Sequence, residues 1–168
     1  MVRGKRRILF LMRWGLRLGM LVLGAGSLGA GAASAQNTAP IPVSLPDTSG
    51  VASQTSAIPV QVGDLTGEGI FSFEFTVRYN ADTLSVVGID TSGTIAAGLN
   101  AVVNTDRTGT AIVSAAAREA LSGSGTLVKL IVRQKGIGTS PLVWEEFQFN
   151  EGRPDADLSG GTVTVEPL

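Results

Sequence analysis

The sequence predicts an all-β protein in which nine short strands form a sandwich of two β-sheets. The clearest sign is the segment Phe71–Tyr79, where apolar and polar residues alternate strictly. A period of two describes a strand that buries one face and exposes the other to water. Elsewhere, β-branched runs are punctuated by Gly, Asp, Asn and Ser at spacings typical of sandwiches. The residues of the segment expected to face the core are Phe71, Phe73, Phe75, Val77 and Tyr79.

The expected strands follow one another between residues 43 and 165, each bounded by turn residues. No helical period lasts longer than a turn or two. The best helical candidate is Ala115–Leu121, but Ile112 and Val113 just before it favour a strand that ends in a turn. The nine predicted strands are Val43–Leu45, Ser56–Val62, Ile70–Tyr79, Leu84–Ile89, Asn100–Asn104, Thr110–Ala116, Gly125–Gln134, Leu142–Phe149 and Thr162–Val165.

Residues 1–35 have the pattern of a secretory signal peptide. Six basic residues and no acid precede or border the short apolar segment Leu18–Leu23, and Ala33-Ser34-Ala35 offers a small-x-small cleavage pattern. A membrane anchor is the alternative, but the apolar run is interrupted by glycines and is shorter than the roughly 18 residues that a spanning helix needs. We therefore expect cleavage after Ala35 and no membrane span in the mature protein. Translation could start at Met1 or at Met12, since a complete signal follows either one.

Removal of the signal leaves a short leader, residues 36–41, and one β-sandwich domain, residues 42–166. Six of the 13 basic residues leave with the signal, so 7 basic and 14 acidic residues remain, a net charge of −7. An acidic surface without basic clusters argues against nucleic acid and anionic membranes as partners. The chain contains no cysteine, so the domain stands without disulfides. The expected location is outside the cytoplasm: the medium, the periplasm or the cell envelope.

Residue types suited to catalysis are scarce. The chain has no histidine and no cysteine, which removes the commonest general base and the thiol nucleophile. Glu145 and Glu146 are adjacent, and on a regular strand they point to opposite faces. A pair of catalytic carboxylates must instead face one cleft. We therefore expect a protein without enzymatic activity.

One segment imitates a calcium-binding loop. Asp155, Asp157 and Ser159 are spaced as calcium ligands, and Glu166 stands where the bidentate acid belongs. However, Thr162–Val165 alternates like a strand, which would carry Glu166 far from the other ligands. A loop followed by a final strand is the preferred interpretation, with Asp155 and Asp157 as weak candidates for calcium.

Direct carbohydrate binding is an alternative function, because sugar-binding modules often have this sandwich shape. Sugars stack on exposed aromatic faces. After signal cleavage the one tryptophan is Trp144, and the alternation places Tyr79 with the core phenylalanines. Trp144 is thus the candidate carbohydrate-binding residue, although its neighbours Phe147 and Phe149 favour a place in the core.

Several segments resemble cohesin modules, over roughly Pro40 to Val165. The polar turn Tyr79-Asn80-Ala81-Asp82-Thr83-Leu84 after the alternating strand is similar to the turn that follows the family's third strand. No single motif is highly specific, but the order and spacing of all of them together are fairly specific. The other segments that carry the resemblance are Ile58–Leu65, Gly67–Ile70, Gly88–Asp90, Leu121–Leu130, Phe147–Gly152 and Gly160–Val165.

The resemblance implies a nine-stranded jelly-roll sandwich that receives a dockerin on one sheet face. The partner would be a dockerin-bearing secreted protein that brings its own calcium, so this chain would need no cofactor, and the assembly could serve polysaccharide degradation. Ser72 and Glu74 occupy the family's polar-x-acidic pair, and the alternation independently places both on the wet face. The residues that the resemblance and the spacing nominate for partner binding are Ser72, Glu74, Thr76, Arg78, Asp106, Arg107, Ser114 and Arg118.

Two features of the sequence leave the function open. The alanine-rich segment Ala115–Ala117 stands where many cohesins have larger apolar residues, which would weaken binding or select a different partner. A purely structural sandwich is a third interpretation beside partner binding and sugar binding, because a fold does not fix a function.

Overall fold

The computed structural model describes residues 39–168, so the predicted signal peptide and residues 36–38 of the leader lie outside the described residues. The described part is all-β, and it contains no helix that could cross a membrane. Its strands are β1 Ile41–Ser44, β2 Thr48–Val51, β3 Thr55–Val62, β4 Ile70–Arg78, β5 Leu84–Asp90, β6 Val102–Asn104, β7 Thr110–Leu121, β8 Gly125–Gln134, β9 Gly138–Phe149, β10 Ala156–Ser159 and β11 Gly161–Glu166.

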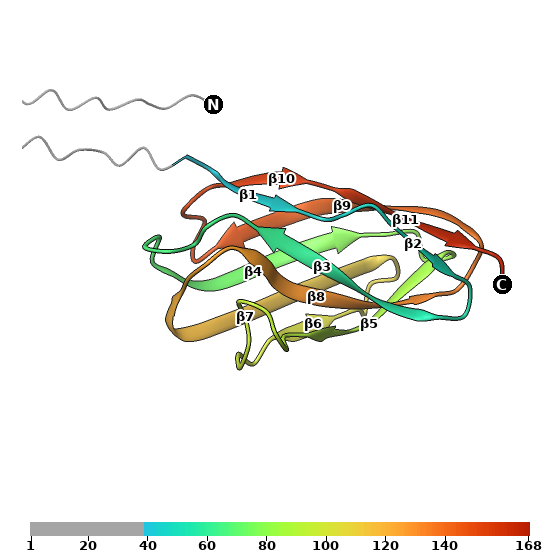
Figure 1. Ribbon diagram of the computed structural model, residues 1–168, viewed down its shortest axis with the longest axis horizontal. Helices are drawn as coiled ribbons and strands as arrows, with labels where there is room; N and C mark the ends of the chain where they lie inside the picture. The colour runs from blue at the N-terminus through green and yellow to red at the C-terminus, as the bar shows by residue number, and fades with distance from the viewer. Residues whose placement is uncertain (1–38) are drawn as a thin grey trace, which may run out of the picture. The chain divides into compact units, whose positions relative to one another are not determined.

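The strands form two sheets that lie one over the other, with most strands running along the long axis (Figure 1). The five-stranded sheet has the order β10-β1-β3-β8-β5, and the six-stranded sheet has the order β2-β11-β9-β4-β7-β6. The pairs β1–β10 and β2–β11 are parallel, and the remaining pairs are antiparallel. The predicted two-sheet jelly-roll sandwich is therefore confirmed.

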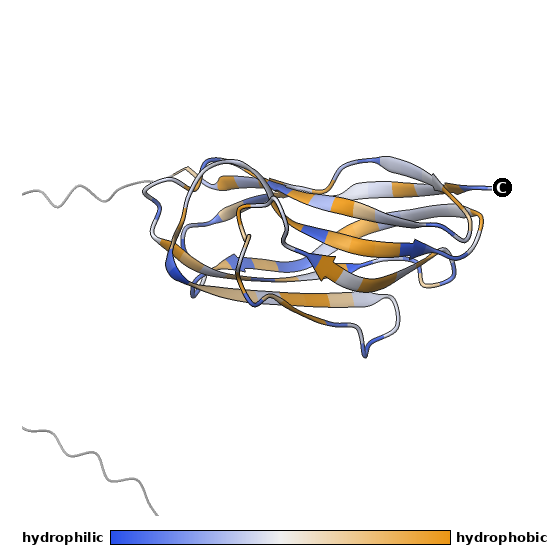
Figure 2. Ribbon diagram, turned by 60° about the horizontal axis from the view of Figure 1, so that its bottom comes forward, coloured by the Kyte–Doolittle hydropathy of each residue, from blue (hydrophilic) through white to orange (hydrophobic). Residues whose placement is uncertain are grey.

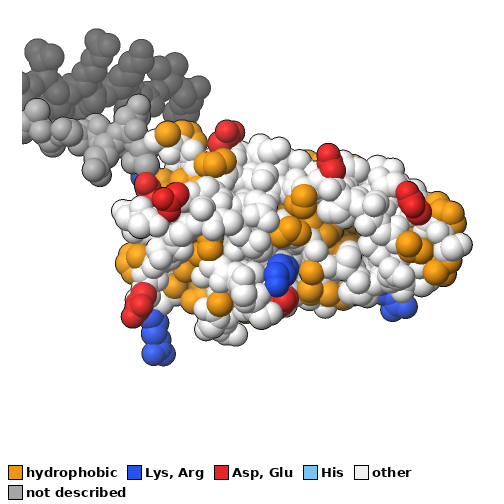
Figure 3. Space-filling view, viewed as in Figure 1, with side chains coloured by type: hydrophobic (Ala, Val, Ile, Leu, Met, Phe, Trp, Pro, Cys, Tyr) orange, Lys and Arg blue, Asp and Glu red, His pale blue; other side chains and the backbone are white. Residues whose placement is uncertain are grey.

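The core lies between the two sheets and is formed by alternate residues of the strands. Phe73, Phe75 and Phe149 fill it from the six-stranded sheet, and Ile58 and Leu130 fill it from the other, all of them buried. Apolar and polar bands alternate along several strands in Figure 2, as the period of two requires. On the face seen in Figure 3, charged side chains are scattered among uncharged ones, and an acidic and a basic side chain adjoin near its centre.

All nine predicted strands are present, and the structure adds two short ones. The additional strands, β2 and β10, have the sequences TSGV and ADLS; the first lacks apolar alternation, and the second is only four residues long and buries none of them fully. Each instead pairs in parallel with a neighbour at the edge of a sheet. The strand expected to end near Ala116 continues to Leu121, so the segment after Ala116 is extended and does not turn.

The start of β4 corrects one prediction about the core. Phe71 was expected to be buried, but 47% of its surface is exposed, whereas Ile70 is fully buried. The pairing of β4 with β7 shifts register between Ile70 and Ser72, which indicates a β-bulge. Between the pairs Ile70–Leu121 and Ser72–Ala116, β4 has one residue and β7 has four, so the extra residues belong to β7. At this irregularity β4 departs from its period of two: Ile70 and Phe73 both face the core, and Phe71 is turned outward. Of the other residues predicted to face the core, Phe73, Phe75 and Val77 are buried, and Tyr79 is partly buried against the core.

Candidate partner-binding face

The outer surface of β9, β4, β7 and β6, hereafter the partner face, carries most of the predicted binding residues. Ser72, Glu74, Thr76 and Arg78 alternate along β4 with core residues, so all four lie on the side away from the core. Glu74 and Arg78 are exposed, and Ser72 and Thr76 are half-buried between the neighbouring strands. The structure thus brings these four residues together on one face.

Strand register places further residues beside this row. Glu74 lies opposite Ser114 of β7 on one side and opposite Gln148 of β9 on the other. Ser114 in turn lies opposite Val102 of β6, which is 54% exposed. Directly opposed residues in antiparallel strands share a face. Gln148 and Val102 therefore belong to the partner face, although their own sequence context gave no signal for them.

A β-bulge in β9 corrects the prediction for the two adjacent glutamates. Thr76 lies opposite Glu146, but the next residue of β4, Val77, lies opposite Trp144. Glu145 is thus the extra residue of the bulge. Both glutamates are exposed on the partner face. The expectation that they point to opposite faces is therefore wrong. The bulge also keeps the aromatic residues on either side of it turned toward the core.

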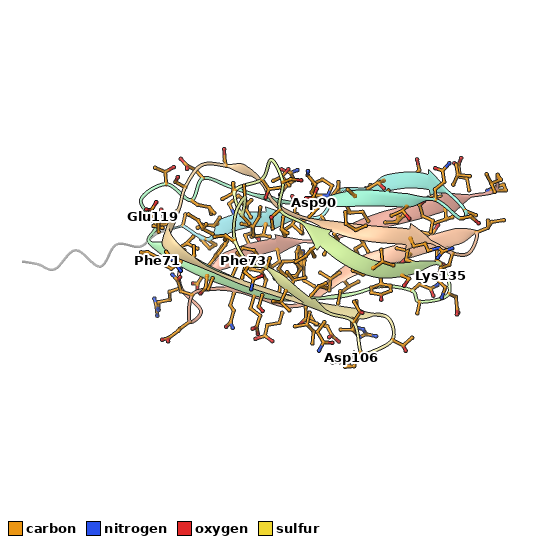
Figure 4. The ribbon with its side chains drawn as sticks, turned by 90° about the horizontal axis from the view of Figure 1, so that it is seen from below. Phe71, Phe73, Asp90, Asp106, Glu119 and Lys135 are labelled. Atoms are coloured by element: carbon orange, nitrogen blue, oxygen red, sulfur yellow. The ribbon has the colours of Figure 1, made fainter. Side chains whose placement is uncertain are left out.

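Glu145 joins two arginines at one end of the partner face. Its Oε1 atom lies 3.5 Å from Nε of Arg78 and 3.7 Å from Nη2 of Arg107. Arg107 belongs to the turn between β6 and β7, where the N–H of Asp106 donates to Oδ1 of Asn104. Asp106 lies at the outer tip of this turn (Figure 4). The ion pairs therefore draw a residue predicted from the turn, Arg107, next to one predicted from β4, Arg78.

Arg118 lies apart from the arginines at positions 78 and 107. It belongs to the second half of β7, beyond the part that pairs with β6. There it lines a hollow of about 650 Å³ together with Ile95 and Leu99 of the β5–β6 connection. Arg118 and Arg107 thus mark opposite ends of β7, so a single small ligand could not contact both.

A smaller depression of about 310 Å³ lies in the middle of the partner face. Its lining includes Ser72 and Glu74 of β4, Ala116 of β7, Val102 of β6 and Gln148 of β9. Ser72 and Ala116 lie opposite each other, and because their side chains are short, the surface of the partner face is recessed at this point. The depression can accept a protruding side chain of another protein.

Asn150 fixes the edge of this depression and was not identified from the sequence. Its backbone has a positive φ of 47°, a conformation that asparagine adopts more readily than most residues. Its Oδ1 atom accepts hydrogen bonds from the N–H groups of Phe71 and Ser72, at 2.8 Å and 3.3 Å. Its Nδ2 group donates to the carbonyl oxygens of Gly69 and Arg153, each at 3.1 Å. The side chain therefore ties the start of β4 to the end of β9.

The carbohydrate-binding candidate, Trp144, is half-buried and held on several sides. Its ring makes edge-to-face contacts with Phe75 and Phe147, with centroids 5.4 Å and 5.5 Å apart. Its Nε1–H group donates to the carbonyl oxygen of Ser159 at 2.9 Å. These contacts occupy the ring, and the geometry gives no added support to a flat sugar-stacking platform.

The predicted loop that carried the weak calcium candidates contains a strand. Asp157 lies in β10, where it pairs with Pro42 of β1, and the carbonyl oxygen of Asp155 accepts a hydrogen bond from the N–H of Ile41. In residues 39–168, no three acidic, histidine or cysteine side chains form a group able to hold a metal ion. Strand pairing thus explains the position of these two aspartates without a metal.

A charged cluster fixes the start of the connection between β5 and β6. Oδ1 of Asp90 accepts hydrogen bonds from the hydroxyl group and the backbone N–H of Ser92. The Nζ atom of Lys129 lies 3.3 Å from Oδ2 of Asp90 and donates to the carbonyl oxygen of Ser92 at 2.8 Å. These interactions, the Ser92 hydroxyl foremost, lower the pKa of Asp90 from 3.8 to about 2.

The fold and the face together define a class of protein: a β-sandwich binding module. The model of the cohesin domain family matches residues 41–153, which is more than half of the chain. The chain therefore belongs to the cohesin domain family, and the resemblance seen in the sequence is confirmed. No curated protein matches it significantly.

Solved structures of cohesins share the fold. The sixth cohesin of scaffoldin B from Acetivibrio cellulolyticus, in complex with a mutant Cel5 dockerin, has a TM-score of 0.65 and 21% identity, and covers 76% of this chain and 99% of its own. A non-cellulosomal cohesin from the archaeon Archaeoglobus fulgidus has a TM-score of 0.64 and 14% identity, with coverages of 76% and 92%. The third ScaC cohesin of A. cellulolyticus, bound to a ScaB dockerin with a mutated C-terminal helix, has a TM-score of 0.61 and 16% identity, with coverages of 74% and 98%.

Proposed function

We propose that this protein is a secreted, non-catalytic module that binds a dockerin-bearing protein through the partner face. The observation that carries the proposal is the outward row Ser72, Glu74, Thr76 and Arg78 on β4, which lies between β9 and β7 within the six-stranded sheet. Membership of the cohesin family supports the kind of partner, and two of the similar solved structures hold a dockerin.

The shape of the partner face suits a protein better than a small molecule. The face spans four strands and is hollowed only shallowly at its centre, whereas small ligands are usually enclosed in deeper clefts. Glu74 and Ser114 would contact the partner from the centre of the face. Asp106 and Arg107 would contact it from one end, and Arg118 from the other.

The wider context is also part of the proposal. The signal-peptide pattern of residues 1–35 supports export, and the partner's dockerin would carry the calcium that the complex needs. Such an assembly could serve polysaccharide degradation, although one of the similar structures is a cohesin described as non-cellulosomal. A role of the complex in polysaccharide degradation therefore needs a test separate from the test of dockerin binding.

The first experiment is a pull-down with the purified protein against secreted proteins of the same organism, once with calcium and once with a chelator. Capture of a protein that mass spectrometry shows to contain a dockerin, lost on chelation, would support the proposal. Retention of the protein by insoluble polysaccharide, with no dockerin captured, would overturn it in favour of sugar binding. Trp144 would then be the first residue to change.

A charge-reversal variant tests whether the partner face is the binding surface. The double substitution Glu74→Lys with Arg78→Glu should weaken dockerin binding by about 2–5 kcal/mol if both charges are enclosed in the interface. Asp157→Lys with Arg133→Glu is the matched control, because it makes the same charge changes on strands of the other sheet. Isothermal titration calorimetry measures both. Equal affinity for the wild type and the Glu74/Arg78 variant would exclude this face.

A further inference from the structure

Two arginines at one end of the partner face share a single carboxylate oxygen. Arg78 and Arg107 approach Oε1 of Glu145 to within 3.5 Å and 3.7 Å, from a strand and from a turn. The three side chains together carry one net positive charge. They form a small positive area on a domain whose overall charge is negative.

Both guanidinium groups keep most of their hydrogen-bonding capacity free. Each carries five N–H donors in a planar fork that matches a carboxylate, and the ion pairs with Glu145 join Nε of Arg78 and Nη2 of Arg107 to one oxygen. The side chains of Arg78 and Arg107 are 64% and 67% exposed, whereas that of Glu145 is 29% exposed. The unused donors therefore face solvent and can reach an approaching acid.

The centre of the partner face has the opposite charge. Glu74 and Glu146 are exposed on neighbouring strands, and neither makes an ion pair among residues 39–168. Glu74 precedes Arg78 by four residues on the same strand, a rise of about 13 Å. The centre of the face thus carries unpaired carboxylates, whereas the end at the β6–β7 turn carries two exposed guanidinium groups, with Asp106 beside them in the turn.

We propose that Arg78 and Arg107 form a carboxylate-binding subsite and that an acidic side chain of the partner occupies it. The proposal rests on the proposed function. It adds which charged side chains the partner presents and in which direction the partner lies on the face. A basic side chain of the partner pairs with Glu74 while the acid meets the arginines. The partner can therefore lie on the face in one direction only, because the reversed direction brings like charges together.

A helix along β4 fits this arrangement. Two turns of an α-helix rise about 11 Å, so an acidic and a basic residue seven or eight positions apart lie on one side at nearly the spacing of Arg78 and Glu74. The dockerin of one similar structure contains a C-terminal helix. The matching partner is thus a dockerin with an acid and a base two turns apart on an exposed helix.

The test measures the affinity of the dockerin identified by the pull-down for four forms of the protein. Arg78→Gln with Arg107→Gln should weaken binding about tenfold, since interfacial charge pairs couple by amounts of at least this size. Arg133→Gln with Lys135→Gln, which removes one positive charge from β8 and one from the loop after it, should change it less than twofold. Circular dichroism confirms that each variant is folded.

Glu145→Gln separates partner contact from mere stabilisation of the turn. This substitution removes the same two ion pairs but keeps both arginines. Glutamine also keeps the shape of the Glu145 side chain, whose carboxylate would compete with the partner's acid for the arginines. Binding as tight as the wild type or tighter supports the subsite, whereas binding that falls as far as in the arginine double variant overturns it. A double-mutant cycle should then couple Arg107 to one partner carboxylate, and Glu74 to one basic residue seven or eight positions from it.

The possible failures are distinguishable. If the Glu74/Arg78 reversal abolishes binding but the arginine-to-glutamine variant binds normally, the partner face stands and the carboxylate subsite is wrong. If the cycle couples Arg107 to no partner acid, the subsite is likewise wrong. If the wild-type protein binds no dockerin at all, both proposals fall.

Discussion

Phe75 and Phe71 belong to the same strand but have opposite surroundings. Phe75 is fully buried and contacts three other rings, those of Phe73, Phe147 and Trp144. Phe71 has almost half of its surface in water, and only its backbone is held, through the side chain of Asn150. The difference arises at the register irregularity between the start of β4 and the end of β7, where β4 departs from its period of two.

We therefore expect the two phenylalanines to contribute very differently to stability. Phe75→Ala should lower the free energy of unfolding by about 3–5 kcal/mol, because it leaves a cavity in the core. Phe71→Ala should change it by less than about 0.5 kcal/mol. Urea unfolding followed by circular dichroism measures both. A cost for Phe71→Ala near that of Phe75→Ala would mean that Phe71 is buried.

Asp90 provides a pH-dependent prediction. Ser92→Ala removes the hydroxyl donor, so the pKa of Asp90 should rise from about 2 toward its ordinary value of 3.8. Because folding lowers this pKa, the stability that Asp90 contributes is present above about pH 3.8 and is lost as the pH falls through about 2. The variant should lose part of that contribution. NMR titration of the carboxyl carbons measures the pKa, with Asp64, whose pKa Thr66 lowers, as an internal control.

The bulge in β9 shows how one strand can expose two consecutive acidic residues and still fill a core. Trp144 and Phe147 both turn inward although they are three positions apart, which a regular strand does not allow. The extra residue also brings Glu145 within reach of Arg78. A local irregularity of the strand thus creates the charged end of the partner face.

Two single-residue deletions test this description of β9. Deleting Glu145 should remove the bulge, leave the inward residues on their face and cost no more than about 1 kcal/mol, since the lost ion pairs are exposed. Gln148 lies outside the bulge, so its deletion should turn Phe149 away from the core and lower the free energy of unfolding by about 3 kcal/mol or more. Urea unfolding gives both values. Equal costs would mean that β9 pairs regularly.

The domain as a whole is acidic and contains few ion pairs. Residues 39–168 hold 14 acidic and 7 basic residues, and their ion pairs involve Arg78 and Arg107 with Glu145, and Lys129 with Asp90. Charged side chains on the face shown in Figure 3 are dispersed. Repulsion among unpaired carboxylates should therefore outweigh attraction at neutral pH.

Added salt should accordingly stabilise the protein. Raising sodium chloride from 10 mM to 300 mM shortens the screening length several-fold and weakens the repulsion. We expect the unfolding temperature to rise by about 3 °C, the change that roughly 1 kcal/mol produces in a domain of this size. Differential scanning calorimetry measures it, and sucrose at matched osmolality is a control for nonspecific exclusion. A fall in unfolding temperature would mean that the ion pairs dominate.

Local patterns were sufficient for the larger part of the fold and for part of the partner face. The alternation in β4 correctly predicted that Ser72, Glu74, Thr76 and Arg78 share the outer face. It failed at Phe71, because a bulge is an adjustment between two strands and the strand's own sequence keeps an unbroken period of two. Whether the residues of this face bind a partner stays a prediction.

The sequence by itself determined that the chain forms a two-sheet sandwich, because hydrophobic periodicity decides which residues enter a core wherever the strands are regular. It also determined the cohesin family, through the order of its segments. The tertiary structure alone decided which residues from different strands meet: Glu145 with two arginines, and Asn150 with the start of β4. These contacts depend on register and on bulges, which arise only when strands pair across long separations in sequence.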